Sequence, residues 1–261
     1  MEGKPQEEPL LTGALRWMAA FVNSWVHFLP LFVVGPFSKE LGRRLYQSWA
    51  RNSLRIFGIT ASLQDENDGE SLQAPFLYVW LNQSNLAEGA ISIYLLPPGF
   101  VVINIEYALM PLAGMARAFL GDVVIIRQWK RQAKRGIERA AARIIAGESG
   151  MISIEGARSA DGSLLPYKKG PVVLAIKTQA TIIPMVMHGG RDVLPPGTWR
   201  LRPGNVQLRL LKAIPVRGLS YEDRDEVMEQ LRMTAEQALA GDAAQQSVAG
   251  DGQPAARAGR T

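Results

Sequence analysis

The feature that most constrains the fold is a regular alternation, from residue 75 onward, of short apolar runs with longer segments of helical periodicity. The apolar runs are rich in Val, Ile and Leu and predict strands. These strands cover residues 59–63, 75–81, 100–105, 122–127, 150–154, 181–187 and 205–211. The segments between them predict helices over residues 85–95, 107–120, 128–146, 170–179 and 221–239. Nearly continuous apolar strands that alternate with helices predict an α/β fold, with a mixed, largely parallel sheet flanked by helices.

Binding sites in such sheets gather where strands end at their carboxyl edge. The residues after Leu81, Arg127 and Ile154 are therefore the candidates. The loop after Ile154 holds Glu155, Gly156, Arg158 and Ser159. A glycine lets the backbone approach a ligand closely, and a guanidinium can bind a phosphate through two hydrogen bonds. A charged loop with a glycine is also typical of a solvated turn, so the residues alone leave both interpretations open.

Composition bounds the kinds of site that the chain can hold. Its 261 residues suffice for one sizeable core, and the absence of cysteine excludes disulfides and thiolate chemistry. With only two histidines, a histidine-rich metal site is excluded, and no metal ion is expected. The net charge of +5 and the pI near 9.6 suit an anionic membrane surface at least as well as nucleic acid. No nucleic-acid-binding motif accompanies the charge, so no nucleic-acid partner is expected.

The N-terminal part is the most apolar stretch of the chain. Residues 10–37 are interrupted by Arg16, Asn23 and Pro30, and their Trp and Phe residues resemble an interfacial aromatic set. Residues 38–57 read as a second amphipathic helix with a basic face. The pattern favours a helix in the membrane interface, broken at Pro30, over one packed on the core or one that spans. We expect membrane-associating helices over residues 1–58, an α/β domain over 59–240 and a disordered tail over 241–261.

Several motifs in the right order carry a resemblance to a known family. The loop Glu155-Gly156-Ala157-Arg158-Ser159 is followed by Asp161-Gly162, by Pro166-Tyr167-Lys168-Lys169-Gly170 and by Ile183-Pro184. This series resembles the glycerolipid acyltransferase family, whose members esterify lysophosphatidic acid and related acceptors. The resemblance runs from about residue 45 to residue 216, and Ala157 departs from the threonine usual in the family. It implies that Glu155, Gly156, Arg158 and Ser159 bind the acceptor, with Arg158 on its phosphate.

The family's first motif is degenerate here. The family that this chain resembles carries a histidine and an aspartate separated by four residues. The histidine acts as general base, and the aspartate orients it. In the register set by Gln83-Ser84, Asn82 stands in place of the histidine and Ala87 in place of the aspartate. Glu88 is the nearest alternative carboxylate. Glu88 lies one residue beyond the aspartate position, and on a helix that step rotates a side chain by about 100°, so Glu88 does not simply replace the aspartate. A glutamate here is also explained by the favourable place of an acid at a helix N-terminus.

The second block of the family is matched by Pro111, Gly114, Gly121 and Arg127, whereas its usual lysine is Asn104. Arg127 is expected to contact the acceptor phosphate, or else to form a salt bridge or a solvated strand end. The helix that follows carries a basic face with Lys130, Arg131, Lys134, Arg135, Arg139 and Arg143. That face is either solvated or a contact for anionic lipid or an acidic acyl carrier.

The resemblance implies transfer of an acyl chain from an acyl thioester, coenzyme A or acyl carrier protein, to a lysophospholipid in phospholipid synthesis or remodelling. It implies no cofactor besides that donor, and a place on a membrane phospholipid surface, at the cytoplasmic face of the inner membrane. Because Asn82 and Ala87 replace the catalytic pair, a non-catalytic lipid-binding or regulatory module stays as the alternative. An unrelated task on the same fold is a third.

Overall fold

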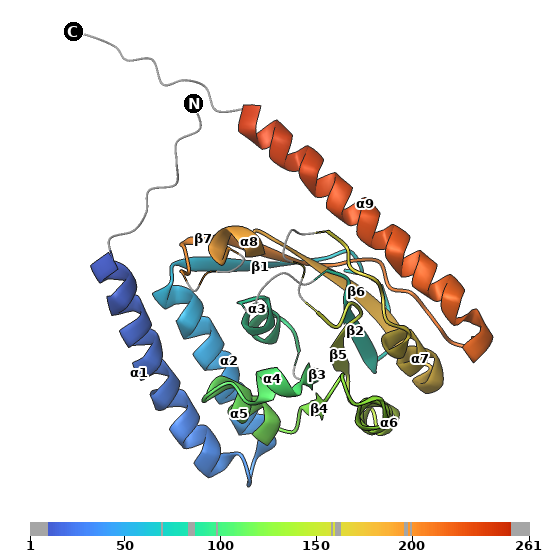
Figure 1. Cartoon of the computed structure of the whole chain (residues 1–261), viewed down its shortest axis with the longest axis horizontal. Coiled ribbons are helices and arrows are strands. Elements are labelled where there is room, and N and C mark those ends of the chain that lie inside the picture. The colour runs from blue at the N-terminus through green and yellow to red at the C-terminus, as the bar shows by residue number, and fades with distance from the viewer. Residues whose placement is uncertain are drawn as a thin grey trace.

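The computed structural model describes residues 10–68, 70–82, 87–97, 99–157, 159, 163–195, 198 and 200–251. Within these residues the chain forms a seven-stranded mixed sheet with helices on both faces (Figure 1). The strands are β1 (Ile59–Asp65), β2 (Phe76–Trp80), β3 (Phe100–Asn104), β4 (Val123–Ile125), β5 (Gly150–Ser153), β6 (Thr181–His188) and β7 (Gly204–Leu210). Each lies within or close to a predicted strand.

The order across the sheet is β1-β7-β6-β2-β5-β3-β4. Neighbours from β6 to β4 run parallel, while β7 is antiparallel to β6 and pairs with β1 in parallel. The prediction of a mixed, largely parallel sheet is confirmed. The central strands are apolar on both sides because both faces are covered, whereas the edge strand β1 is largely exposed.

Alternate side chains of β2 enter two different cores. Leu77 and Val79 pack against α6 (Lys130–Ile145), α7 (Lys169–Thr178) and α9 (Arg224–Asp251). Tyr78 and Trp80 face the other layer, where α1 (Leu10–Val34), α2 (Lys39–Ile56), α3 (Ala87–Leu95), α4 (Ile105–Ala108) and α5 (Ala113–Phe119) lie (Figure 1). The remaining helices are the short α8 (Gly190–Val193) and the single turn η1 (Tyr221–Asp223).

The first two helices form a hairpin that is fastened by buried polar contacts. Asn23 donates from Nδ2 to the carbonyl of Trp49 at 3.2 Å and to Ser53 Oγ at 3.0 Å. Phe28 and Leu31 are fully buried against α2 and α5. The expected break at Pro30 is wrong, because α1 continues to Val34. Buried side chains on both sides of the proline hold the helix in place despite the lost backbone hydrogen bond.

Two other elements differ from expectation. The single helix expected over residues 107–120 is split into α4 and α5 around Pro111, where the chain must interrupt its helical hydrogen bonds. At the other end α9 runs to Asp251, into the region expected to be a disordered tail. Ala and Gln dominate that region and are good helix formers, so low hydrophobicity alone does not end a helix there. Residues 252–261 lie outside the described residues.

Candidate active site at the carboxyl edge of the sheet

The ends of β2 and β5 bring two predicted motifs together. Trp80 pairs with Ser153 in register, and the amide of Ile154 donates to the carbonyl of Trp80 at 3.1 Å. Asn82 and Glu155, each two residues beyond this pair, therefore leave the same edge of the sheet from adjacent strands. The strand register thus places these two motifs side by side at the carboxyl edge.

Arg127 connects the two neighbouring strand ends to this loop. Asn104, the last residue of β3, pairs with Ile125 on β4 and accepts a hydrogen bond from the amide of Arg127 at 3.3 Å. The guanidinium of Arg127 donates from Nη1 to the carbonyl of Gly156 at 2.5 Å, and its Nη2 lies 3.4 Å from Glu106. Its side chain remains 42% exposed, so the cation is positioned at the edge without being shut away from a ligand.

The loop after β5 is shaped by two of its residues. Gly156 has φ +66°, a left-handed backbone that a residue with a Cβ adopts only with strain. Glu155 is 2% exposed and accepts from the amide of Leu165 at 2.6 Å, which ties the returning chain to the strand end. Ser159 is fully buried. Arg158 lies outside the described residues, so its predicted role stays a prediction.

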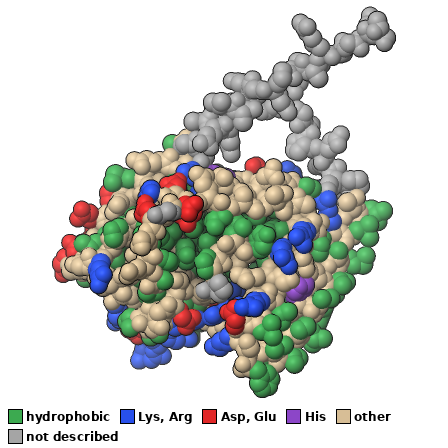
Figure 2. Space-filling view, turned by 180° about the vertical axis from the view of Figure 1, so that it is seen from behind, with side chains coloured by type: hydrophobic (Ala, Val, Ile, Leu, Met, Phe, Trp, Pro, Cys, Tyr) green, Lys and Arg blue, Asp and Glu red, His purple; other side chains and the backbone are tan. Residues whose placement is uncertain are grey.

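A cavity of about 450 Å³ extends from this edge into the protein. Arg127, Gly156 and Lys168 line it at the carboxyl edge, and Tyr46 and Trp49 on α2 line it elsewhere. Its walls are mostly apolar and come from Trp80, Ile93, Val102, Met110, Ile137 and Met151, among others. Figure 2 shows hydrophobic side chains gathered in a hollow on one face of the molecule. An apolar body with a few polar groups is the usual form of a site for an amphiphilic ligand.

Asn104 supplies a polar group inside this cavity. It is 8% exposed and lines the cavity, and its Nδ2 is a buried donor for which the described residues supply no hydrogen-bond partner. A buried donor left unsatisfied costs about 1–3 kcal/mol, which an oxygen atom of a bound molecule would recover. In the sequence alone, Asn104 stands out only as the replacement of a lysine. The signal for its role is its place at a strand end beside Arg127.

The cavity is closed on one side by a buried ion pair. Arg117 donates to Asp122 from Nε at 2.5 Å and from Nη2 at 2.7 Å, and both residues line the cavity. Asp122 also accepts from the amide of Val101 at 2.9 Å. Burial raises the pKa of Asp122, while the Arg117 charge and the Val101 amide oppose that rise.

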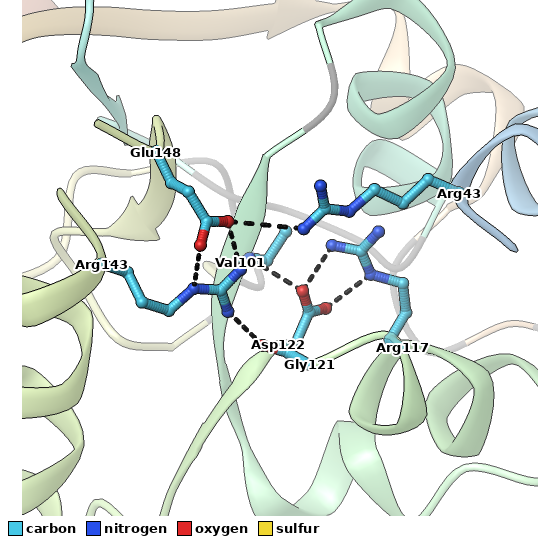
Figure 3. A network of polar contacts seen from close by, with 7 residues as sticks. All are labelled: Arg43, Val101, Arg117, Gly121, Asp122, Arg143 and Glu148. Carbon is cyan, nitrogen blue, oxygen red and sulfur yellow. Dashed lines mark hydrogen bonds and ion pairs between the residues drawn. The ribbon is translucent and has the colours of Figure 1, made fainter. Parts of the chain in front are cut away.

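A second set of charges lies beside this pair (Figure 3). Glu148 contacts Arg143 at 2.6 Å and Arg43 on α2 at 3.4 Å. Arg143 also donates to the carbonyl of Gly121. The hydrogen bond from Arg143 lowers the pKa of Glu148, and burial opposes it. The network therefore fastens the N-terminal hairpin to the α/β domain.

Asn82, Ala87 and Glu88, from the first motif of the sequence analysis, flank the same edge. Asn82 donates from Nδ2 to the carbonyl of Ser163 at 3.4 Å, and residues 83–86 lie outside the described residues. Ala87 begins α3, and Glu88 in its first turn is 2% exposed. Of the predicted site residues that the structure describes, Arg127 and Gly156 line the cavity, whereas Asn82, Glu88, Glu155 and Ser159 do not.

Two further properties of the described residues bear on ligands. No group of three or more His, Asp or Glu side chains among them is placed to hold a metal ion.

Among the described residues, α1 is the helix whose length and hydropathy would allow it to cross a membrane. Its outward side is a row of exposed apolar side chains, namely Leu11, Leu15, Met18, Phe21, Val22, Trp25, Val26, Leu29 and Val33.

Comparison with known proteins agrees with the fold and the motifs. The acyltransferase family model matches residues 67–188. The 1-acyl-sn-glycerol-3-phosphate acyltransferase alpha of Homo sapiens is 25% identical over 221 residues, which cover 82% of this chain and 77% of that protein. A 1-acyl-sn-glycerol-3-phosphate acyltransferase of Limnanthes douglasii is 30% identical over 161 residues, 61% of this chain and 56% of the relative.

The fold is shared with a solved structure. The crystal structure of the 1-acyl-sn-glycerophosphate acyltransferase of Thermotoga maritima superposes with a TM-score of 0.62 at 20% identity, over 85% of this chain and 98% of that one. Sheet, motif order and sequence similarity coincide over the same residues. Residues 67–188 therefore match the acyltransferase family, and the chain is similar over 82% of its length to a 1-acyl-sn-glycerol-3-phosphate acyltransferase.

Proposed function

We propose that the protein transfers an acyl chain from an acyl thioester to the hydroxyl group of a lysophospholipid, in phospholipid synthesis or remodelling. The observation that carries the proposal is the mostly apolar cavity whose polar end lies at the carboxyl edge, beside Arg127 and Gly156. Such a cavity suits a molecule with a hydrocarbon chain and a polar group at one end. The family relationship supplies the reaction class.

Each residue at the edge has a role in this proposal. Arg127 and Lys168 hold the anionic headgroup of the acceptor, with Arg158 on the phosphate as the family resemblance implies. Asn104 donates from Nδ2 to an oxygen atom of the ligand. Glu155, through its bond to the Leu165 amide, and Ser159 position the loop. Gly156 allows the backbone to approach the ligand.

The chemical step needs no group beyond the two substrates and a path for one proton. The acceptor hydroxyl oxygen attacks the thioester carbon, the new C–O bond forms, the C–S bond breaks, and the hydroxyl proton ends on the departing thiolate. Asn82 has no basicity for this transfer and Ala87 has no group to orient a base. General-base assistance is worth roughly 10²–10⁴-fold, so slow turnover is expected. We assign any residual general-base assistance to the carboxylate of Glu88.

The membrane is the second partner in the proposal. The exposed apolar row of α1 inserts into the interface of a phospholipid surface and keeps the cavity close to lipid acceptors. The hairpin contacts of Asn23 and the burial of Phe28 fix that row relative to the α/β domain. The location that follows is membrane-associated, at the cytoplasmic face of the inner membrane.

A cavity-filling variant tests the proposal with a matched control on the same helix. Ala133 on α6 lines the cavity, whereas Ala142 on the same helix is exposed. Protein purified in detergent would be assayed with palmitoyl coenzyme A and a panel of lysophospholipids. We expect slow transfer by the wild type, its loss in Ala133→Phe and its retention in Ala142→Phe. Equal activity of both variants would contradict the assigned cavity.

A non-catalytic lipid-binding or regulatory module is the second candidate, and the replacement of both motif residues by Asn82 and Ala87 favours it. The same preparations separate the two. The non-catalytic module would be supported, and the proposed acyltransferase activity refuted, by two results together. The wild type would bind lysolipid in a way that Ala133→Phe abolishes, and it would show no turnover above the buffer rate.

A further inference from the structure

Helix α6 has two different faces. Its inner face carries Ala133 and Ile137, which line the cavity, and Ala140 and Ile144, which are buried in the core. Its outer face carries exposed cations at helical spacing, namely Lys130, Arg131, Lys134, Arg135 and Arg139. The cations therefore lie on the far side of the helix whose inner side borders the proposed acyl cavity.

Within the part of the chain that the structure describes, ion pairs do not neutralise most of the charge on this outer face. Among the residues that the structure describes, Lys130, Arg131, Lys134 and Arg135 form no ion pair, and Glu138 is the one acid in α6. Arginines on other helices are partnered: Arg44 with Glu40, Arg117 with Asp122 and Arg232 with Glu236. An unpaired row of like charges on a helix costs stability through repulsion, and it is relieved when an acidic surface covers it.

The row begins at the carboxyl edge. Arg127, which bonds Gly156, lies three residues before α6, and Trp129 at its N-cap is 68% exposed. From Lys130 to Arg139 the helix rises by about 14 Å. That length exceeds the reach of a single phosphate group and matches a facing helix of several acidic residues.

The position of α6 argues against a bilayer as its occupant. The exposed apolar row lies on α1, which stands at one flank of the molecule in Figure 1, whereas α6 lies at the other, with α2, α3 and the sheet between them. Figure 2, seen from behind, likewise shows Lys and Arg side chains gathered at the lower left and hydrophobic ones at the right. A membrane bound by α1 leaves the cations of α6 in water.

We propose that the outer face of α6 docks an acidic acyl carrier protein, which presents its thioester-linked acyl chain to the cavity. This inference rests on the proposed function, because it assigns the protein donor for the same site. Complementary charge would speed encounter and fix the orientation of the carrier, with a strong dependence on salt. Coenzyme A, a much smaller donor, would not need the full length of the row.

The test uses a charge reversal on α6 and a matched reversal elsewhere. Lys134→Glu/Arg135→Glu changes the net charge by the same amount as Lys177→Glu/Arg217→Glu. Lys177 and Arg217 are also exposed cations, and both lie near Gln179, whose side chain accepts from the amide of Gly218. Binding of palmitoyl-loaded acyl carrier protein would be measured by fluorescence anisotropy at low and at physiological salt, and transfer with carrier and coenzyme A donors.

We expect the α6 reversal to weaken carrier binding at least about tenfold at low salt, equivalent to about 1.4 kcal/mol, and to leave the KM for palmitoyl coenzyme A unchanged. The Lys177→Glu/Arg217→Glu control should bind the carrier like the wild type. Equal carrier binding by all three proteins would overturn the proposal. So would a loss, in the α6 reversal alone, of binding to phosphatidylglycerol vesicles with carrier binding intact. Carrier binding that depends on α6 without transfer from either donor would support docking and overturn the proposed function.

Discussion

The buried pair of Arg117 and Asp122 allows the sharpest stability prediction. Its side chains are 9% and 3% exposed, and the carboxylate accepts three hydrogen bonds, two from Arg117 and one from the amide of Val101. Asp122→Asn keeps the shape but leaves one oxygen in place of two. It also turns an NH2 group toward a guanidinium that stays buried and charged. Removing one partner of a buried pair costs about 3–5 kcal/mol.

For a chain of this size that cost lowers the Tm by about 6–20 °C, at roughly 2–4 °C per kcal/mol. The raised pKa of Asp122 indicates that burial outweighs the favourable contacts of its charged form. Because desolvation of two buried charges offsets much of their attraction, we expect the pair as a whole to contribute little net stability, although removing either member alone is costly. Arg117→Met/Asp122→Leu, which replaces both with apolar side chains, should accordingly lose less than Asp122→Asn.

Urea unfolding in detergent, followed by tryptophan fluorescence, measures both variants at one pH and salt concentration. Glu148→Gln is the control, because the Glu148 side chain is 41% exposed and its ion pairs are worth about 1 kcal/mol or less. Asp122→Asn should lie well below this control. If Asp122→Asn loses no more than Glu148→Gln, or if the double variant is the least stable of the three, the reasoning about the buried pair is refuted.

Two further predictions concern packing and pH. In Gly114→Ala the new Cβ would lie 1.9 Å from the carbonyl oxygen of Tyr107, so the variant should lose about 1–3 kcal/mol of stability. In Gly89→Ala the new Cβ meets no heavy atom within 4 Å among the described residues outside its own helix, so that variant should be neutral or up to about 1 kcal/mol more stable. Chemical denaturation measures both, and equal stabilities would refute the contact. The hydrogen bond from Arg143 lowers the pKa of Glu148 in the folded protein, so its stabilising contribution is present above the ordinary carboxyl pKa of about 4.3 and is lost as pH falls through the lowered value. The urea midpoint should therefore fall more steeply on acidification in the wild type than in Glu148→Gln, and parallel curves would contradict that assignment.

The sheet could be predicted from the sequence because its strands are short apolar runs between turns, a signal that each segment carries locally. The split at Pro111 and the extension of α9 to Asp251 were missed for different reasons. A proline within a helical pattern leaves open whether the helix kinks or stops. A polar, Ala-rich segment can continue an existing helix without burying a face of its own.

The site was predictable only where a motif carries it. Arg127 and Gly156 both follow strand ends in the sequence, and the structure adds their contact at 2.5 Å. The cavity could not be foreseen, because its lining comes from α2 through α7 and depends on how distant segments pack. The unsatisfied amide of Asn104 is visible only once its neighbours are placed.

The most direct test of the central claim, acyl transfer at the carboxyl edge beside Asn82, is the ratio of kcat/KM between Asn82→His/Ala87→Asp and the wild type. Both proteins would be assayed with one thioester donor and the preferred lysolipid. The account predicts slow, Ala133→Phe-sensitive transfer by the wild type and a gain of about 10²–10⁴-fold on restoring the base and its orienting carboxylate. Turnover by neither protein, although both bind the lysolipid, would contradict it.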